Sequence, residues 1–378
     1  MSHGSPSDMV SLSRQRSQGR RHMASPRACL PGCDTMTVVP PILVIGAPRS
    51  GTSWLGAILD SHPATLLRHE PDTIDRDLSY GFVTDEMNCA AARRHLECLS
   101  HCRMLKAAGA RPIFRKYYRS LVARVLRAGL IYGFKGAENY VHPAFRRLRV
   151  PDLVDRGWPR VVIKSVDLGR APVWTHAWPE MPAVLIVRHP CGHAASVLAG
   201  QRSGHLPPRH PLTFADCEHG RKYGISPHFL ETQPPEIQTA WRWAVLNDRA
   251  LEQMRAPLVI TYESLCADPV GVSRRVFAHC GLAWNQQSET FIARSTSGDG
   301  AFFETRRNPK VAAERWRTIF PAAATVMRTV QGTRAASLFD LEADLAELAD
   351  ARAGLDTKPF EPEQPDDGDQ RSTIDMAG

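Results

Sequence analysis

A short apolar run that leads into a glycine-containing turn constrains the fold of this chain more than any other feature. Residues 42–45 read ILVI, residues 46–51 read GAPRSG, and residues 53–59 follow a helix-compatible pattern. A strand that turns directly into a helix directs several backbone N–H groups and the positive end of the helix dipole at one point, which favours a bound phosphate. The turn therefore predicts a phosphate-binding loop, and an ordinary tight turn with a helix cap is the alternative.

The residues of this loop exclude the commonest nucleotide-binding pattern. GxxxxGK[ST] needs a lysine before its Ser/Thr, whereas here Gly51 precedes Thr52 directly and the cation, Arg49, comes earlier. A magnesium-dependent phosphoryl transferase also needs carboxylates near the strand ends. The runs 160–163 and 183–187 are instead followed by Lys-Ser and Arg-His. Asp167 lies too far beyond the end of its run to serve as that carboxylate. The pattern favours transfer of an anionic group without metal over magnesium-ATP chemistry.

Apolar, β-branched runs bounded by turns are typical of short buried strands. Five such runs lie at residues 42–45, 65–67, 161–163, 183–187 and 258–261, and helical patterns lie between them at 53–59, 192–198, 237–254 and 269–279. This alternation predicts a P-loop-like, doubly wound α/β fold, with a parallel sheet of about five strands flanked by helices. Two further helical segments, 308–330 and 337–351, are expected to close the fold.

Residues 75–159 interrupt this pattern with a long helical insert, which we expect on the substrate side. Within it, residues 113–130 repeat apolar side chains at a period of about 3.6 and carry basic side chains on the opposite side. Such a helix either rests on a core with its basic side solvated or lies on a membrane surface. The solvated basic side is the favoured interpretation.

The two ends of the chain differ in composition from its middle. Residues 1–37 are a Ser/Arg/Gly/Pro-rich basic arm and residues 356–378 an acidic tail, so both are expected to be disordered. The domain is then 38–355, and it carries about +10 of charge because the arm has five bases against two acids and the tail seven acids against two bases. This charge suits a polyanionic ligand. Nucleic acid is not expected, since the bases form no single stripe, and no apolar run is long enough for a membrane span.

Cysteine usage indicates a reducing compartment. The chain has nine cysteines without regular spacing, which favours free thiols and a cytoplasmic location. The segment HLECLSHC places potential zinc ligands within two helical turns, namely His95, Cys98, His101 and Cys102. Zinc sites usually draw four ligands from two separate segments. Ordinary roles are therefore favoured for these residues, and no metal is expected.

Two separated motifs resemble those of the PAPS-dependent sulfotransferases. GAPRSGTSWL resembles their 5′-phosphosulfate loop, in the arginine-bearing form of tyrosylprotein sulfotransferases and many bacterial members. LIVRHPCGHAASV resembles the motif in which a strand-terminal arginine and a serine eight residues later bind the 3′-phosphate, here Arg188 and Ser196. The resemblance spans residues 42–320 and implies PAPS as co-substrate and PAP as product. The nucleotide contacts that it implies in the loop are Arg49, Ser50, Gly51, Thr52, Ser53 and Trp54, although packing is the favoured use of the tryptophan.

Three further segments resemble the family more loosely. VIKSVDL contains Lys164 and has a valine where proline is usual, and TYESL contains Tyr262, for which a core position is equally expected. RRNPKVAAERWRTIF resembles a late basic loop that reaches the 3′-phosphate. The corresponding candidates there are Arg306, Arg307 and Lys310.

The resemblance also implies roles in catalysis. Sulfuryl transfer has a loose, in-line transition state, so catalysis means positioning the acceptor, neutralising the leaving phosphate and removing a proton. The guanidinium of Arg49 can bridge the phosphate and sulfuryl oxygens, and Lys164 adds a second positive charge. Glu70 stands 21 residues after Arg49, where arginine-loop members keep a catalytic glutamate. Glu70 is the favoured base and its neighbour His69 the alternative.

The expected activity is transfer of a sulfuryl group from PAPS to a hydroxyl of a small molecule or carbohydrate. Peptide tyrosine is the alternative acceptor, and the acceptor itself cannot be deduced from the insert or from residues 200–235. A P-loop nucleotide kinase and a non-catalytic nucleotide-binding protein are the rival functions. The first would need magnesium-ATP, and the second would bind PAP without depending on Glu70.

Overall fold

A five-stranded parallel sheet forms the centre of the fold. The computed structural model describes residues 39–74, 88–207, 212–297 and 308–356, which belong to the unit Val39–Gly378. The strands are β1 (Ile42–Ile45), β2 (Thr65–His69), β3 (Arg160–Ser165), β4 (Ala183–Val187) and β5 (Leu258–Thr261). Their order is β2-β3-β1-β4-β5, and every neighbouring pair is parallel. All five predicted strands are confirmed.

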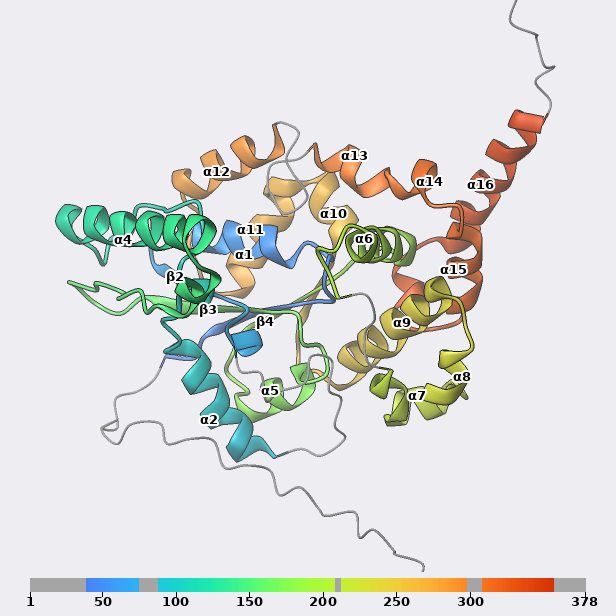
Figure 1. The fold of residues 1–378 in the computed structure, drawn as a ribbon, viewed down its shortest axis with the longest axis horizontal. Helices are drawn as coiled ribbons and strands as arrows, with labels where there is room; N and C mark the ends of the chain where they lie inside the picture. Colours follow the sequence, from blue (N-terminus) through green and yellow to red (C-terminus); the bar gives the residue numbers. More distant parts are fainter. Residues whose placement is uncertain (1–38, 75–87, 208–211, 298–307, 357–378) are drawn as a thin grey trace, which may run out of the picture. The chain divides into compact units, whose positions relative to one another are not determined.

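Helices cover both faces of this sheet because alternate strand residues bury opposite faces. Ile42 and Val44 of β1 pack with one set of helices, α1 (Thr52–Asp60), α10 (Tyr262–Ala267), α11 (Pro269–His279) and α12 (Gln286–Thr296). Leu43 and Ile45 pack with the other set, α2 (Cys89–Ser100), α5 (Ala171–Ala177), α6 (Pro190–Arg202), α9 (Pro235–Gln253) and α15 (Ala323–Val330). Figure 1 shows α1, α11 and α12 on one side of the strands and α2 and α5 on the other. The predicted doubly wound fold is confirmed.

The described part of the insert contains α2, α3 (Leu105–Ala108), α4 (Leu121–Tyr140) and the 3₁₀ turn η2 (Pro143–Arg147). Residues 113–120, expected to be helical, are not. Helix α4 begins only after Ser120, whose hydroxyl accepts the N–H of Ala123 at 3.3 Å as an N-cap. The helical prediction was therefore wrong for the first eight residues and stopped ten residues short of the end.

The orientation of α4 also differs from the prediction. Leu121, Val122 and Val125 are 65, 76 and 62 % exposed, whereas Arg127 is 5 % exposed and donates to the carbonyl of Ala108 at 2.6 Å. The expected solvated basic side is thus wrong at Arg127. An apolar period locates the two sides of a helix, but only tertiary contacts decide which of them is covered.

The remaining helices lie around the sheet and near the C-terminal end. They are α7 (Glu218–Lys222), α8 (Pro227–Glu231), α13 (Pro309–Glu314), α14 (Trp316–Ile319) and α16 (Leu341–Asp356). The predicted helix 308–330 is divided into α13, α14 and α15. One break falls at Phe320, which is extended (φ −120°, ψ 90°), because the proline that follows disfavours a helical conformation there.

Candidate active site

The loop between β1 and α1 has the geometry of an anion-binding turn. Arg49 and Gly51 have positive φ, 69° and 90°, and the N–H of Ser50 donates to the carbonyl of Ala47 at 3.1 Å. Position 51 needs glycine for two reasons. Its φ of 90° disfavours any residue with a side chain, and a Cβ there would lie 2.5 Å from Cδ2 of Tyr262. In the described structure, no side chain caps α1. The N–H groups of its first turn are therefore available to a ligand.

The two predicted donor motifs are in direct contact. Nε of Arg49 donates to the hydroxyl of Ser196 at 3.0 Å, and a terminal nitrogen of Arg188 donates to the carbonyl of Arg49 at 2.9 Å. These contacts join residues 139 and 147 positions apart in the chain. The structure therefore brings Arg49, Arg188 and Ser196 together at the carboxyl ends of β1 and β4.

Arg188 is held by several elements at once. Its second terminal nitrogen donates to the carbonyl of Ala312 at 3.1 Å, and its guanidinium lies 4.7 Å from the ring centre of Tyr262. The indole of Trp243 donates to the Arg188 carbonyl at 2.9 Å. Tyr262 is both a core residue and a neighbour of the predicted phosphate ligand, so its two interpretations are compatible.

Glu70 and Lys164 form an ion pair at the ends of the neighbouring strands β2 and β3. Lys164 Nζ donates to Glu70 Oε1, and the Glu70 N–H donates to the Lys164 carbonyl at 2.7 Å. The Lys164 side chain is 1 % exposed, and Glu70 has a positive φ of 46°. A non-glycine residue in this region costs about 1–3 kcal/mol and is characteristic of functional sites. Arg49 and Glu70 share this property.

Electrostatics around this pair set the ionisation of both base candidates. Burial alone would raise the pKa of Glu70, but the charge of Lys164 and its hydrogen bond lower it to about 2. Desolvation and the charge of Lys164 lower the pKa of His69 to about 4, and the charge of Glu70, 3.9 Å from Nε2, only partly opposes them. At neutral pH Glu70 is therefore ionised and His69 is neutral.

Comparison with known proteins identifies the family. The model of the sulfotransferase family matches residues 40–286, more than half of the chain. This chain belongs to the sulfotransferase family. Mouse carbohydrate sulfotransferase 5 is 24 % identical over 325 residues, which cover 75 % of each protein. Human carbohydrate sulfotransferase 2 is 42 % identical over 65 residues, which cover 16 % of this chain and 12 % of that protein. Family membership supports sulfotransfer as the activity.

Solved structures of other sulfotransferases are also similar to the chain. The sulfotransferase domain from the curacin biosynthetic pathway aligns over 83 % of this chain and 98 % of its own, with 14 % identity and a TM-score of 0.37. Mouse sulfotransferase SULT7A1, complexed with PAP, aligns over 80 % and 88 %, with 14 % identity and a TM-score of 0.37.

Two carboxylates that hold the strand ends of this sulfotransferase were missed from the sequence. Asp72 accepts a hydrogen bond from the Ser165 hydroxyl at 2.9 Å, and Glu263 accepts one from the His189 N–H at 3.0 Å. Burial raises the pKa of both carboxyls. Ser165 and His189 directly follow the basic residues at the ends of β3 and β4. The signal was present, because Asp72 lies two residues after the candidate Glu70 and Glu263 directly follows Tyr262 in TYESL.

The remaining candidate residues from the sequence differ in their exposure and contacts. Trp54 is 8 % exposed, and its indole donates to the Ser295 hydroxyl at 3.0 Å, in agreement with the favoured packing use. Thr52 is buried at the start of α1, whereas Ser53 is exposed. Lys310 is exposed in α13, and the two arginine candidates before it, Arg306 and Arg307, lie outside the described residues.

The four potential zinc ligands, His95, Cys98, His101 and Cys102, lie in or directly after α2, within the described ranges. No group of three or more His, Cys, Asp or Glu side chains there is arranged to hold a metal. His95 packs its ring against Trp174, with centroids 5.8 Å apart, and Nδ1 of His101 lies 2.8 Å from the Glu97 carbonyl. In the same ranges, no helix is both long and apolar enough to cross a bilayer.

Proposed function

We propose that this chain transfers a sulfuryl group from PAPS to a hydroxyl of a small molecule or carbohydrate, in line and without a metal. The observation that carries the proposal is the contact of Arg49 with both Ser196 and Arg188. These residues belong to two motifs that resemble a 5′-phosphosulfate loop and a 3′-phosphate site. Their contact gives one ligand access to both.

The residues present fit such a nucleotide. The hydroxyl of Ser50 and Nε of Arg188 are buried and have no hydrogen-bond partner within the described protein. Buried polar groups are normally satisfied, so each suits an oxygen of a bound anion. The uncapped first turn of α1 adds backbone donors. PAPS supplies an activated sulfuryl group whose leaving group is the 5′-phosphate of PAP.

In this proposal, each charged residue at the strand ends has one task. The guanidinium of Arg49 neutralises the charge that develops on the leaving phosphate, where a bidentate cation is most effective. Arg188 and Ser196 hold the 3′-phosphate and orient the donor. Glu70 takes the proton of the acceptor hydroxyl.

Lys164 links the donor and acceptor sides. While its ammonium is bound to Glu70, it holds the pKa of that carboxyl near 2 and makes it a weak base. A negatively charged donor competes for the same ammonium. As Lys164 turns towards the sulfuryl oxygens, the pKa of Glu70 rises and the carboxylate becomes a stronger base. The base is thus activated when the donor is in place.

His69 is the alternative base. It is neutral at physiological pH and its side chain is 31 % exposed, so it can accept a proton. Glu70 is preferred because it forms the ion pair with Lys164 and has the positive φ that directs the turn after β2. Replacement of each residue separately by Gln or Asn distinguishes the two.

The carbohydrate sulfotransferase relative favours a carbohydrate as acceptor, and peptide tyrosine is the alternative. An acceptor panel with radiolabelled PAPS tests this choice. The cytoplasmic location and the absence of a metal requirement are further predictions, the latter tested by activity in the presence of a chelator.

The donor is tested by thermal unfolding with PAP, AMP and ADP. We expect PAP to raise Tm more than AMP does, and Arg188→Gln to remove that difference. Arg202→Gln, at the exposed C-terminal end of α6, is the matched control. Equal stabilisation by PAP and AMP would contradict the 3′-phosphate site. PAP binding without transfer to any acceptor, unchanged in Glu70→Gln, would indicate a non-catalytic binding protein.

A further inference from the structure

A small cavity lies at the end of α1 opposite the donor loop. Its volume is about 20 Å³, and its walls come from Asp60 at the C-terminal end of α1, from Leu66 and Leu67 of β2, and from the insert. The insert contributes apolar residues and three cationic side chains, Lys116, Arg119 and Arg127. The helix α1 spans about 13 Å at 1.5 Å per residue, so this cavity is separate from the candidate active site.

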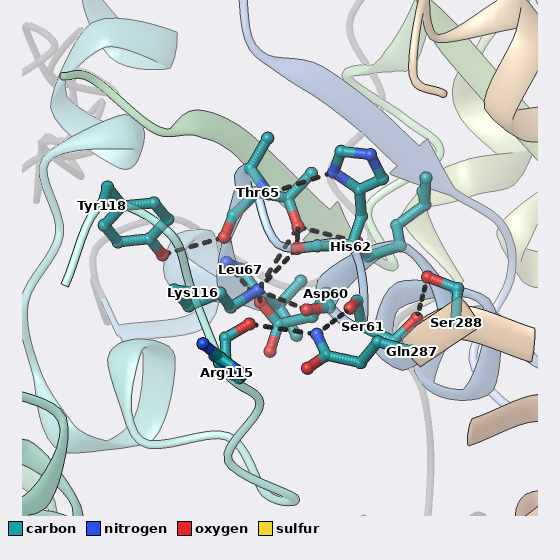
Figure 2. Close-up of polar contacts among 12 residues, drawn as sticks. Asp60, Ser61, His62, Thr65, Leu67, Arg115, Lys116, Tyr118, Gln287 and Ser288 are labelled. Atoms are coloured by element: carbon teal, nitrogen blue, oxygen red, sulfur yellow. Dashed lines mark hydrogen bonds and ion pairs between the residues drawn. The ribbon is translucent and has the colours of Figure 1, made fainter. Parts of the chain in front are cut away.

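Within the cavity wall, Lys116 is fully satisfied by protein groups. Its ammonium donates to the carbonyl and the carboxylate of Asp60, the latter at 3.0 Å, and to the carbonyl of His62 at 3.1 Å. Figure 2 shows these bonds converging on Nζ, beside the hydroxyl of Thr65. Lys116 thereby caps the negative end of α1 and occupies the Asp60 carboxylate.

The two arginines have no such carboxylate in the hydrogen bonds of the described chain. Arg119 donates to the backbone carbonyl of Asp152 at 2.8 Å, and Arg127 donates to that of Ala108 at 2.6 Å. The Asp152 carboxylate is bound by Arg68 through two hydrogen bonds of 2.9 and 2.8 Å. It also accepts one from Arg103 at 3.0 Å.

Both guanidinium groups keep an unused donor. One terminal nitrogen of Arg119 and Nε of Arg127 are buried without a hydrogen-bond partner in the described protein, and the two residues are only 9 and 5 % exposed. Arginine does not lose its proton in proteins. Burial and the charge of Arg119 lower the pKa of Arg127 to about 10, which leaves it charged at neutral pH.

We propose that this cavity binds a small monovalent anion, chloride, between Arg119 and Arg127. Buried charges are normally paired, and the cavity walls supply cations in excess of their one carboxylate. A single water needs about 10–15 Å³, so about 20 Å³ is enough for one particle of about that size. The anion fastens the insert to β2 and α1, because the walls of the cavity come from all three.

Thermal unfolding in sodium chloride and in sodium gluconate at equal ionic strength tests the proposal. We expect Tm of the full chain to rise with chloride concentration above its value in gluconate. Arg127→Met removes one cation, so the difference between the two salts should disappear. Arg124→Met, on the same helix but outside the cavity wall, should keep it. Equal Tm values of the parent chain in the two salts would overturn the proposal.

Bromide soaked into crystals gives an independent readout that does not depend on the folding of a variant. An anomalous peak beside Arg119 and Arg127, together with chloride-dependent Tm, is the expected result. A cavity without a bromide peak overturns the proposal, and so does a bromide peak without any effect of chloride on Tm, which would mark an adventitious ion only.

Discussion

Arginines occupy two regions of this molecule in different ways. At the strand ends, Arg49 and Arg188 are partly exposed and bind each other's segment and the hydroxyl of Ser196. In the insert, Arg119 and Arg127 are almost completely buried and bind backbone carbonyls. In our proposals, the strand-end arginines hold the sulfuryl donor, whereas those of the insert join segments of the chain around a chloride ion. The hydrogen bonds of the insert arginines go to backbone carbonyls, whereas Arg49 binds a side-chain hydroxyl of a second motif.

The largest effect is expected from Glu70→Gln. If the strand ends are the catalytic region, loss of the general base should lower kcat by about 10²–10⁴-fold, with little change in the affinity for PAP. His69→Asn should lower kcat by less than about tenfold, since it leaves the ion pair of Glu70 with Lys164 intact. Initial rates of sulfate transfer measure both. A larger loss in His69→Asn than in Glu70→Gln would assign the base to His69.

Arg49→Ala should follow, with a loss of about 10²–10³-fold in kcat, which is typical of removing one preorganised donor to the transition state. Arg119→Ala is the matched change in the insert, where we expect a fall in Tm and a kcat close to that of the parent. Rate assays and thermal unfolding on the same two samples separate the regions. Loss of activity in Arg119→Ala but not in Arg49→Ala would contradict the assignment of catalysis to the strand ends.

The strand-end region was predictable because local sequence determines it. In a parallel sheet the strand ends meet at one edge, and the family resemblance singled out residues that follow those strands. The structure brings Arg49, Arg188 and Ser196 into contact and pairs Glu70 with Lys164. All five strands could be recognised from apolar runs, because a strand covered on both faces needs such a run. The sequence placed Asp72 and Glu263 beside the candidates Glu70 and Tyr262, but their hydrogen-bond partners could not be predicted, since these depend on how buried loops return to the sheet.

The insert was less predictable because tertiary contacts determine where its longest helix, α4, begins and which side of it is covered. The apolar period predicted a helix between residues 113 and 130, but the N-cap at Ser120 moved it towards the C-terminus. The period also could not show that Arg127 faces inwards, since the Ala108 carbonyl that receives its hydrogen bond lies in another helix. Pattern analysis thus found the helix and failed on its start and its orientation.

The ion pair at the strand ends also predicts a pH-dependent stability. The pKa of Glu70 is about 2 in the folded chain and about 4.3 in an unfolded one, so the carboxylate adds up to about 3 kcal/mol above pH 4.3. This contribution is lost as the pH falls towards 2. Glu70→Gln should therefore be less stable than the parent near pH 7 and approach it near pH 3. Urea unfolding at the two pH values measures the difference, and a constant difference would contradict the lowered pKa.

The two regions also differ in what their backbone tolerates, as Gly51 in the donor loop and Gly129 in α4 show. Gly51→Ala places a Cβ at φ 90° and 2.5 Å from Tyr262, so it should cost about 1–3 kcal/mol of stability. It should also weaken PAP binding, because the turn carries the donors for the ligand. Urea unfolding and PAP titration measure the two effects. Unchanged affinity for PAP in a folded Gly51→Ala variant would show that the loop does not hold the nucleotide.

Gly129→Ala in α4 is the opposite case and should have the smallest effect. A Cβ at this helical position meets nothing within 4 Å, and alanine is favoured over glycine inside a helix by about 0.5–1 kcal/mol. The free energy of unfolding should therefore rise by about that amount, with kcat unchanged. A fall in stability would mean that another group covers this side of α4, because an added methyl group destabilises only where atoms already pack against the site. The exposed apolar side chains beside it, Val125 and Leu126, would then belong to a contact surface.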